Sequence, residues 1–268
     1  VDYSGVYHGP CHCENCKRLF KEQYGLDIPD RDDPRSPDYR KYAAFKSACT
    51  KAQRERLVQT VRSISPELAI NNVDYIRTES ATEIGVPQWQ YSASCNARRT
   101  AGPLRLRPAD NASVDFMGFR YRDSSVSAGQ LALRQWQNLA NAGSVSLYIM
   151  GHLDNHKDRT ALNASKAAFA FHREHEALYR GLQSAAKVLL VTKPIMARSD
   201  PEVYGWVRAL TESHIPFDEV KLTELTPELL RRWDVVILGD VKQCSPQQMT
   251  MLDAYAAQGG IVLASGSA

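Results

Sequence analysis

The run Lys187-Val188-Leu189-Leu190-Val191-Thr192 decides how the C-terminal part of the chain folds. It is short, apolar and rich in β-branched residues, which is typical of a strand buried inside a parallel sheet. Further strand patterns follow it and are separated by helical patterns. The strands are Phe217–Lys221, Asp234–Leu238 and Ile261–Ala264, and the helices are Pro201–Ser213 and Pro246–Gln258. This alternation predicts a doubly wound α/β domain.

The preceding part of the chain also alternates strand and helix patterns. A helical pattern over Asp38–Ile64 ends at Ser65-Pro66, because the residue before a proline disfavours helix. Val114–Tyr121 has apolar residues on both faces, as the strands of parallel barrels do. The other candidates are strands at Val1–Tyr7, Leu68–Asn72, Tyr75–Glu79 and Val145–Met150, and helices at Ser127–Ala142 and His156–Leu182. About five strands are too few to close a barrel of eight, so we predict the C-terminal part of a (β/α)8 TIM barrel.

The pattern changes near Gln183–Ala186, which divides the chain into a partial barrel over 1–184 and a doubly wound domain over 185–268. A chain of 268 residues suits two domains of ordinary size. It does not begin with methionine, and it stops just after a strand pattern that leads into Gly266. We therefore expect both domains to be truncated, and the sequence does not indicate a localisation.

Composition excludes several classes of protein. Hydrophobic residues make up 43% of the chain and charged residues 24%, which excludes a disordered or collagen-like chain. Apolar runs such as Ala186–Val191 are far shorter than the ~20 residues that span a membrane. The net charge is only +3, with acids and bases interleaved. We therefore expect a neutral or small partner, with no nucleic acid and no membrane.

Three of the six cysteines lie together in Cys11-His12-Cys13-Glu14-Asn15-Cys16. Thiolates at this spacing can converge on one zinc ion, which takes four nitrogen or sulfur ligands in a tetrahedron. The fourth ligand could come from several places. The candidates are His8, His12, Cys49, Cys95 and residues outside this sequence. The alternatives are three free thiols or a redox site, although a redox motif is usually a lone pair of cysteines.

A family resemblance rests on this segment. Gly9-Pro10-Cys11-His12-Cys13-Glu14-Asn15-Cys16 and Tyr24-Gly25-Leu26-Asp27-Ile28-Pro29 resemble the segment after the fourth barrel strand of glycoside hydrolase family 42 β-galactosidases and related hypothetical glycosyl hydrolases. Ala128–Gly143 is similar to their helix between strands seven and eight. From Lys187 onward the chain resembles the β-galactosidase trimerisation domain, a flavodoxin-like module related to class I amidotransferases. The resemblance implies a glycosidase, a structural zinc on Cys11, Cys13 and Cys16, and a homo-oligomer, possibly a trimer.

The chain departs from family 42 at both catalytic positions. The family acid/base glutamate ends strand four, where this chain has Val1-Asp2-Tyr3-Ser4-Gly5 and no glutamate. The family nucleophile ends strand seven, where Val114–Tyr121 offers only Asp115. An aspartate at the end of strand four instead resembles α-fucosidases and α-galactosidases, in which it is the nucleophile. This resemblance assigns the nucleophile to Asp2.

Glycoside cleavage needs a second carboxyl group, about 5–5.5 Å from the first when configuration is retained. Glu79 and Glu83 lie in Thr78-Glu79-Ser80-Ala81-Thr82-Glu83, directly after a strand pattern. That position corresponds to the barrel rim where active sites form, so we predict one of them as acid/base, Glu79 first. The alternative for each of the three acids is an ordinary solvated loop residue.

Aromatic and polar side chains near the same rim suit a sugar, which offers apolar C–H faces and many hydroxyls. Each candidate could also be an ordinary core or surface residue. The candidates are Trp89, Tyr91, Asn96, Arg120, Tyr121, Arg122 and His152.

The second domain carries little chemistry. It has no glycine-rich phosphate loop, and Ile261–Ala268 lacks the elbow cysteine of an amidotransferase, so we predict no nucleotide and no organic cofactor. Three functions therefore remain for the chain: a retaining glycosidase, a barrel that binds carbohydrate without cleaving it, and a hydrolase whose cysteine-bound metal acts directly. All-thiolate zinc sites are usually closed and structural, which argues against the third.

Overall fold

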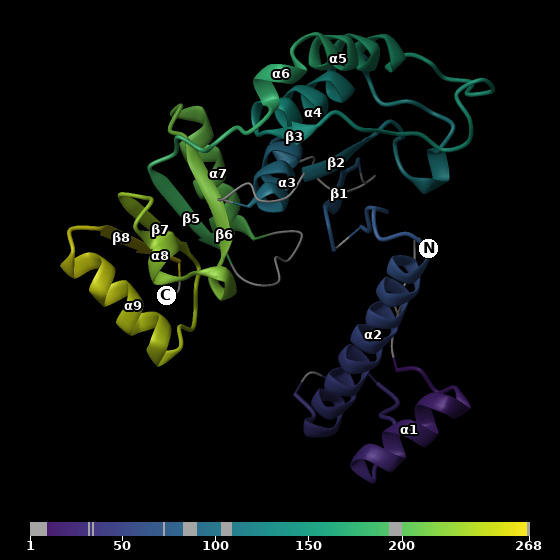
Figure 1. Cartoon of the computed structure of the whole chain (residues 1–268), viewed down its shortest axis with the longest axis vertical. Coiled ribbons are helices and arrows are strands. Elements are labelled where there is room, and N and C mark those ends of the chain that lie inside the picture. The colour runs from purple at the N-terminus through teal and green to yellow at the C-terminus, as the bar shows by residue number, and fades with distance from the viewer. Residues whose placement is uncertain are drawn as a thin grey trace. The chain divides into compact units, whose positions relative to one another are not determined.

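The computed structural model describes residues 10–31, 33, 35–71, 73–82, 90–102, 109–192 and 200–266. Its internal contacts divide the chain into two compact units, Val1–Ile70 and Asn71–Ala268. The second unit contains two parallel sheets (Figure 1). The boundary that we predict near residues 183–186 lies between these sheets and stays a prediction. Among the described helices, none is long and apolar enough to cross a membrane.

The first unit is built from two helices, α1 (Glu14–Tyr24) and α2 (Pro37–Ile64). α2 begins where the sequence predicts, because the Ser36 side chain accepts a hydrogen bond from the amide of Tyr39. α1 ends at Gly25, whose φ of 68° lies in the left-handed region that glycine adopts without strain. Local sequence thus determines where α2 begins and where α1 ends.

Aromatic packing joins the two helices. The ring of Phe20 on α1 meets the rings of Tyr42 and Phe45 on α2 at centroid distances of 5.7 and 5.3 Å. All three side chains are buried. Edge-to-face contacts of this kind add to the stabilisation from apolar burial, so the cysteine-bearing helix is fixed on α2.

The first sheet of the second unit has four parallel strands, in the order β1-β2-β3, with β4 also paired to β2. Its strands are β1 (Ile76–Ser80), β2 (Ala109–Val114), β3 (Gly143–Ser144) and β4 (Leu147–Tyr148). Helices α3 and α4 pack on the strands, and α5 packs on α4 (Figure 1). The bounds are α3 (Ser92–Ala101), α4 (Ala128–Ala140), α5 (Leu162–Glu174), α6 (Glu176–Tyr179) and a 3-10 turn η1 (Phe119–Tyr121).

The face of this sheet that meets α3 and α4 is polar. The Asn111 side chain on β2 accepts hydrogen bonds from Asn96 on α3 at 3.1 Å and donates one to Asn138 on α4 at 2.7 Å. It also exchanges hydrogen bonds with the hydroxyl of Ser80 on β1. Asn111 and Asn138 have no exposed surface, so directional bonds rather than apolar burial hold this face together.

The second sheet is entirely parallel and has the order β6-β5-β7-β8. Its strands are β5 (Val188–Thr192), β6 (Phe217–Lys221), β7 (Val235–Gly239) and β8 (Ile261–Ser265). Its helices are α7 (Pro201–Glu212), α8 (Pro227–Leu230) and α9 (Pro246–Ala257), with a 3-10 turn η2 (Leu222–Glu224). The predicted strands and helices of this region are confirmed to within one residue at each end.

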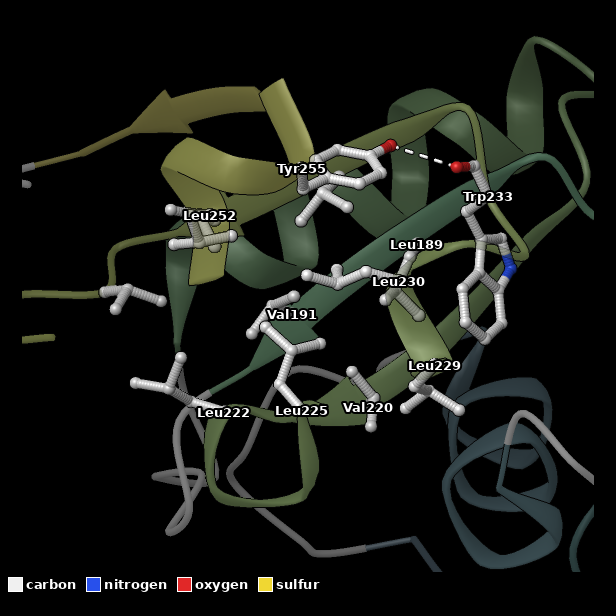
Figure 2. Packing of buried hydrophobic residues seen from close by; sticks show 13 residues of the cluster. Leu189, Val191, Val220, Leu222, Leu225, Leu229, Leu230, Trp233, Leu252 and Tyr255 are labelled. Carbon is white, nitrogen blue, oxygen red and sulfur yellow. Dashed lines mark hydrogen bonds between the residues drawn. The ribbon is translucent and has the colours of Figure 1, made fainter. Parts of the chain in front are cut away.

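Apolar side chains cover both faces of the second sheet, as the alternation of strand residues requires. Leu189 and Val191 on β5 face α8 and α9, where Figure 2 shows Leu230 and Tyr255 packed beside them. The Tyr255 hydroxyl donates to the carbonyl oxygen of Trp233 at 3.0 Å, so its polar atom is satisfied inside this cluster (Figure 2). Leu190 faces the opposite side, where α7 packs.

Helix α3 connects the two sheets through one buried carboxylate. Glu219 on β6 accepts a hydrogen bond from Arg98 Nε at 3.0 Å and another from Arg99 Nε at 2.6 Å. The Glu219 side chain is fully buried, and the Arg98 guanidinium also lies 4.1 Å from the ring centroid of Phe217. Burial alone would lower the pKa of Arg99, but the Glu219 charge raises it. A desolvated charge cluster therefore joins the sheets.

Two predicted strands are wrong. β2 ends at Val114, and Phe116 then pairs antiparallel with Ser125, so the chain after β2 turns back on itself instead of extending to Tyr121. Gly118, with φ of 133°, permits the reversal. Residues 68–71 form only an isolated bridge, between Asn71 and Tyr75. The sequence analysis also missed α3, whose small and polar residues give no apolar periodicity.

Candidate functional site

Three cysteines stand at the start of α1. The Sγ atoms of Cys11, Cys13 and Cys16 lie within 4.8 Å of one another. Cys13 is the N-cap residue, but its side chain makes no capping hydrogen bond. The Cys11 amide donates to the Tyr42 hydroxyl at 2.6 Å, which connects this loop to α2. The fold of the first unit therefore brings the three sulfur atoms together.

The electrostatics of the cluster suit a divalent cation. Hydrogen bonds from the Cys16 amide and thiol lower the pKa of Cys13. Burial, followed by the thiols of Cys13 and Cys11, raises the pKa of Cys16 to about 12. The three thiols do not all ionise unaided, whereas a bound zinc ion deprotonates its thiol ligands. Tetrahedral zinc holds sulfurs about 3.8 Å apart, so small movements would fit the three residues to it.

The fourth ligand stays a prediction. Among the residues that the structure describes, no further His, Cys, Asp or Glu atom joins the cluster. Cys49 is exposed, and Cys95 is buried with Leu190 and Val203 in the core of the second unit. His8 lies outside the described residues.

In parallel α/β barrels, active-site residues lie at the carboxyl ends of the strands. In the second unit, the corresponding region is the carboxyl edge of the first sheet. Glu79 is the second-last residue of β1 and is exposed. The side chains of Thr78 and Ser80 point to the polar helix-facing side, so alternation turns Glu79 to the opposite face. Arg77 and Asp110 share that face, since their side chains pair at 3.3 Å.

Three aromatic rings that were not among the predicted site residues lie at the carboxyl end of β4 and just after β2. Phe116 follows β2 and meets Tyr148 edge-on at 5.4 Å and Phe119 at 5.6 Å. Val114 pairs with Tyr148, so alternation places the rings of Tyr148 and Phe116 on the face of Glu79. Phe119 is 68% exposed. An exposed ring that packs on the buried ring of Phe116 can stack on the apolar face of a sugar.

Asp115, directly after β2, is buried on the opposite, helix-facing side, with 1% of its surface exposed. Its Oδ1 accepts a hydrogen bond from the Ser125 hydroxyl at 2.5 Å, and its Oδ2 lies 3.9 Å from Nε2 of His156. Burial raises the pKa of Asp115, while Ser125, His156 and Arg134 oppose the rise. Burial also lowers the pKa of Arg134 to about 10. Asp115 is thus closed off from solvent.

Two predicted sugar contacts belong to α3, Asn96 on the helix and Tyr91 at its N-cap. The amide nitrogen of Asn96 donates to the carbonyl oxygen of Glu79 at 3.0 Å and to the Asn111 side chain at 3.1 Å. Asn96 thus holds the carboxyl end of β1 from the helix-facing side of the sheet. Tyr91 stands just before α3, and its hydroxyl donates to Glu212 on α7 at 3.1 Å.

The remaining predicted residues divide into two groups. The exposed group, in the segments after β2 and β4, is Arg120, Tyr121, Arg122 and His152. The others, Asp2, Glu83 and Trp89, lie outside the described residues. Glu79 is thus the one predicted catalytic carboxylate that the structure describes. The aromatic rings had a weak sequence signal, because Phe116 and Phe119 lie in the segment that we predicted as a strand.

Comparisons with known proteins bear on the fold of the chain. No family model matches the chain, and no curated protein matches its sequence. The α-L-fucosidase isoenzyme 2 of Paenibacillus thiaminolyticus matches 99% of the chain with a TM-score of 0.71 and 23% identity. The β-galactosidase of Bacillus circulans sp. alkalophilus matches 98% with a TM-score of 0.72 and 15% identity. The chain shares its fold with these glycosidases.

The chain covers 42% of the fucosidase and 50% of the β-galactosidase. It therefore corresponds to half or less of either neighbour. At these identities the likeness establishes a mixed α/β fold with parallel sheets, and it does not extend to residues of the site.

Proposed function

We propose that the protein is a glycoside hydrolase that acts on an oligosaccharide or a simple glycoside. One observation carries the proposal: the exposed Glu79 carboxylate lies at the carboxyl end of a parallel strand, on the face that also bears Phe116 and Tyr148. A carboxyl group beside aromatic rings is what a site needs to protonate a glycosidic oxygen and to stack a sugar. The fold of the two neighbours supports this reading.

The proposed mechanism is retaining. Asp2 attacks the anomeric carbon while Glu79 gives its proton to the departing glycosidic oxygen, so the carbon–oxygen bond breaks and an ester to Asp2 forms. Glu79, now a carboxylate, takes a proton from water. The water oxygen attacks the anomeric carbon and releases Asp2. Glu83 is the alternative acid/base.

The proposed architecture is the C-terminal part of a (β/α)8 barrel followed by a flavodoxin-like trimerisation domain. The order β6-β5-β7-β8 supports the second part, because doubly wound sheets grow in both directions from their first strand. Light scattering on the full-length protein checks the predicted homo-oligomer. A molecular mass equal to that of one chain would contradict the predicted trimer.

The proposed zinc is structural and is held by Cys11, Cys13 and Cys16. Elemental analysis should find one zinc per chain, and Cys13→Ser should lose the metal and lower the melting temperature. A chelator should destabilise the protein without changing the initial rate of catalysis. An immediate loss of turnover would instead favour a catalytic metal.

Glu79→Gln tests the catalytic role in the full-length protein. The substrates are aryl α- and β-glycosides of galactose, fucose, arabinose and glucose. The variant should lose about 10²–10⁴-fold in rate with a poor leaving group and far less with dinitrophenolate, which departs without protonation. Glu174→Gln, an exposed glutamate on α5, is the matched control and should behave as wild type. An equal loss with both leaving groups would contradict an acid/base role.

Asp2→Ala tests the nucleophile separately. Added azide should restore turnover and yield a glycosyl azide of inverted configuration, because the small anion replaces the missing carboxylate. If Asp2→Ala cleaves every aryl glycoside as fast as wild type, Asp2 is not the nucleophile.

A catalytically degenerate barrel that binds carbohydrate is the second candidate. One observation favours it: Asp115, which stands where the family resemblance expects a nucleophile, is buried and hydrogen-bonded on the closed side of the sheet. Calorimetry that detects sugar binding by a full-length protein with no turnover would support this candidate.

A further inference from the structure

Asp115 and His156 each have one buried polar atom that finds no partner among the residues that the structure describes. Within those residues, neither Oδ2 of Asp115 nor Nε2 of His156 makes a hydrogen bond, although both side chains are at least nine-tenths buried. The two atoms face each other at 3.9 Å, which is too long for a hydrogen bond. A native interior rarely leaves two such atoms unsatisfied side by side, so the pair calls for an explanation.

The loop that follows β2 is closed at its base by Asp115. The amide of Val126 donates to the carbonyl oxygen of Asp115 at 2.8 Å, and the amide of Met117 donates to the carbonyl oxygen of Ser124 at 3.3 Å. Residues 117–124 therefore form a compact lobe. This lobe carries the exposed Phe119 and three of the predicted sugar contacts, Arg120, Tyr121 and Arg122.

A second loop, after β4, reaches the same base. Asp158 Oδ2 accepts a hydrogen bond from the Ser125 amide at 2.9 Å, and Asp158 Oδ1 accepts one from the Thr160 hydroxyl at 2.7 Å. Ser125 is thus held by Asp115 through its hydroxyl and by Asp158 through its amide. His156 is two residues before Asp158 on the same loop.

These contacts form a ring of polar groups with one side open. Asp115 bonds Ser125, Ser125 bonds Asp158, and the chain leads from Asp158 back to His156. The open side is the 3.9 Å gap between His156 and Asp115. A movement of about 1 Å would close it to ordinary hydrogen-bond length.

Two arginines near the ring have hydrogen-bond partners of their own. Arg134 of α4 donates to the Val114 carbonyl oxygen at 2.5 Å and to the Thr82 hydroxyl at 2.6 Å, so it braces the strand ends beside Asp115. Arg159 donates to the carbonyl oxygen of His156 at 3.1 Å and leaves the ring nitrogen Nε2 untouched.

We infer that Asp115 and His156 are a positioning pair, whose hydrogen bond closes the ring and holds the lobe 117–124 at the end of β2 for substrate. Asp115 does not contact the sugar, because it is buried on the helix-facing side. The kinetic consequence rests on the proposed glycosidase function. The structural consequence, a lobe whose order depends on this bond, does not.

Two variants of His156 separate a hydrogen bond from mere packing. His156→Leu fills the space without a polar atom, whereas His156→Gln keeps a side-chain amide that can bond Asp115. Hydrogen exchange of peptides covering 117–124 should become about tenfold faster in His156→Leu and stay near wild type in His156→Gln. Asp123→Asn, which changes an exposed carboxylate in the same lobe, is the control and should not alter exchange.

Kinetics give the second measurement. His156→Leu should raise KM for a glycoside about tenfold and leave kcat nearly unchanged, because a loosened lobe weakens binding and leaves the carboxyl groups in place. His156→Gln should restore KM. If the two variants behave alike in exchange and in KM, the inference is wrong.

Two further outcomes are informative. If wild type cleaves no glycoside but exchange follows the prediction, the positioning pair stands and the proposed function fails. If His156→Leu does not fold, Ser125→Ala opens the neighbouring side of the ring from a half-buried position. Unchanged exchange in Ser125→Ala would then overturn the inference.

Discussion

Asparagine side chains fill the space between β2 and its helices, whereas leucine and valine fill the space between β5 and its helices. In the first sheet, Asn111 bonds groups on β1, α3 and α4. In the second, Leu189 and Leu190 pack on α9 and α7 with no polar contact. Both interiors are buried, but hydrogen bonds of fixed direction stabilise the first, whereas close packing of apolar side chains stabilises the second. The proposed acid/base Glu79 stands on the first sheet, where the side chains behind it are held by hydrogen bonds of fixed direction.

The largest effect should arise where the two interiors meet. Glu219→Ala leaves the guanidinium groups of Arg98 and Arg99 buried without their carboxylate. We expect the free energy of unfolding to fall by about 3–5 kcal/mol, measured by urea denaturation. Glu224→Ala, which breaks an exposed ion pair with Lys221, should cost less than about 1 kcal/mol. Similar losses of unfolding free energy in both variants would show that Glu219, Arg98 and Arg99 do not form a desolvated charge cluster.

A pair of substitutions tests the comparison itself. Asn111→Leu adds an apolar side chain to the first sheet, yet it leaves the side-chain oxygen of Asn138 without its donor and removes one acceptor of Asn96. It should cost about 2–3 kcal/mol. Leu190→Met in the second sheet keeps volume and should cost less than about 1.5 kcal/mol. If Leu190→Met is the more damaging change in urea denaturation, the two interiors do not differ as described.

A smaller effect should reveal the one polar bond drawn in the apolar cluster of Figure 2. Tyr255→Phe removes the hydroxyl that donates to Trp233 and leaves its carbonyl oxygen unpaired. The expected loss is about 0.5–1.5 kcal/mol. Tyr121→Phe, at an exposed position, should change stability by no more than about 0.5 kcal/mol and serves as the control.

The smallest effect concerns pH and Asp115. Burial raises the pKa of Asp115, so the folded protein holds this proton more tightly than the unfolded chain does. The buried charge therefore costs stability at neutral pH, and protonation relieves the cost as the pH falls through the raised pKa. Wild type should gain melting temperature relative to Asp115→Asn as the pH falls from 7 toward about 4. A gain for the variant instead would contradict the raised pKa.

The same difference explains what the sequence could predict. The second sheet was predicted to within one residue because its interior is apolar, and apolar periodicity is the signal that sequence patterns carry. In the first sheet the buried strand residues are polar and resemble loop residues, as Ser80, Asn111 and Ser113 do. The sequence pattern therefore predicts a strand at Val114–Tyr121 instead of Ala109–Val114, and it predicts no helix at α3.

The candidate site could be predicted only where its residues lie close together in the sequence. Cys11, Cys13 and Cys16 are neighbours in sequence, and the turn that leads into α1 keeps their sulfur atoms close in space. Asp115 and His156 are brought together by two separate loops, and no pattern in a single sequence reports that meeting. Phe116 and Tyr148 meet across two strands for the same reason.

The shared carboxylate of Glu219 has a consequence for anyone who wishes to produce the two sheets as separate proteins. A cut between residues 184 and 185 would put both arginines in one fragment and their counter-ion in the other. Neither piece would then be an independent domain, since each would expose one half of a charged joint together with the apolar surface around Phe217. The two fragments should be poorly soluble alone and should recombine when they are co-expressed.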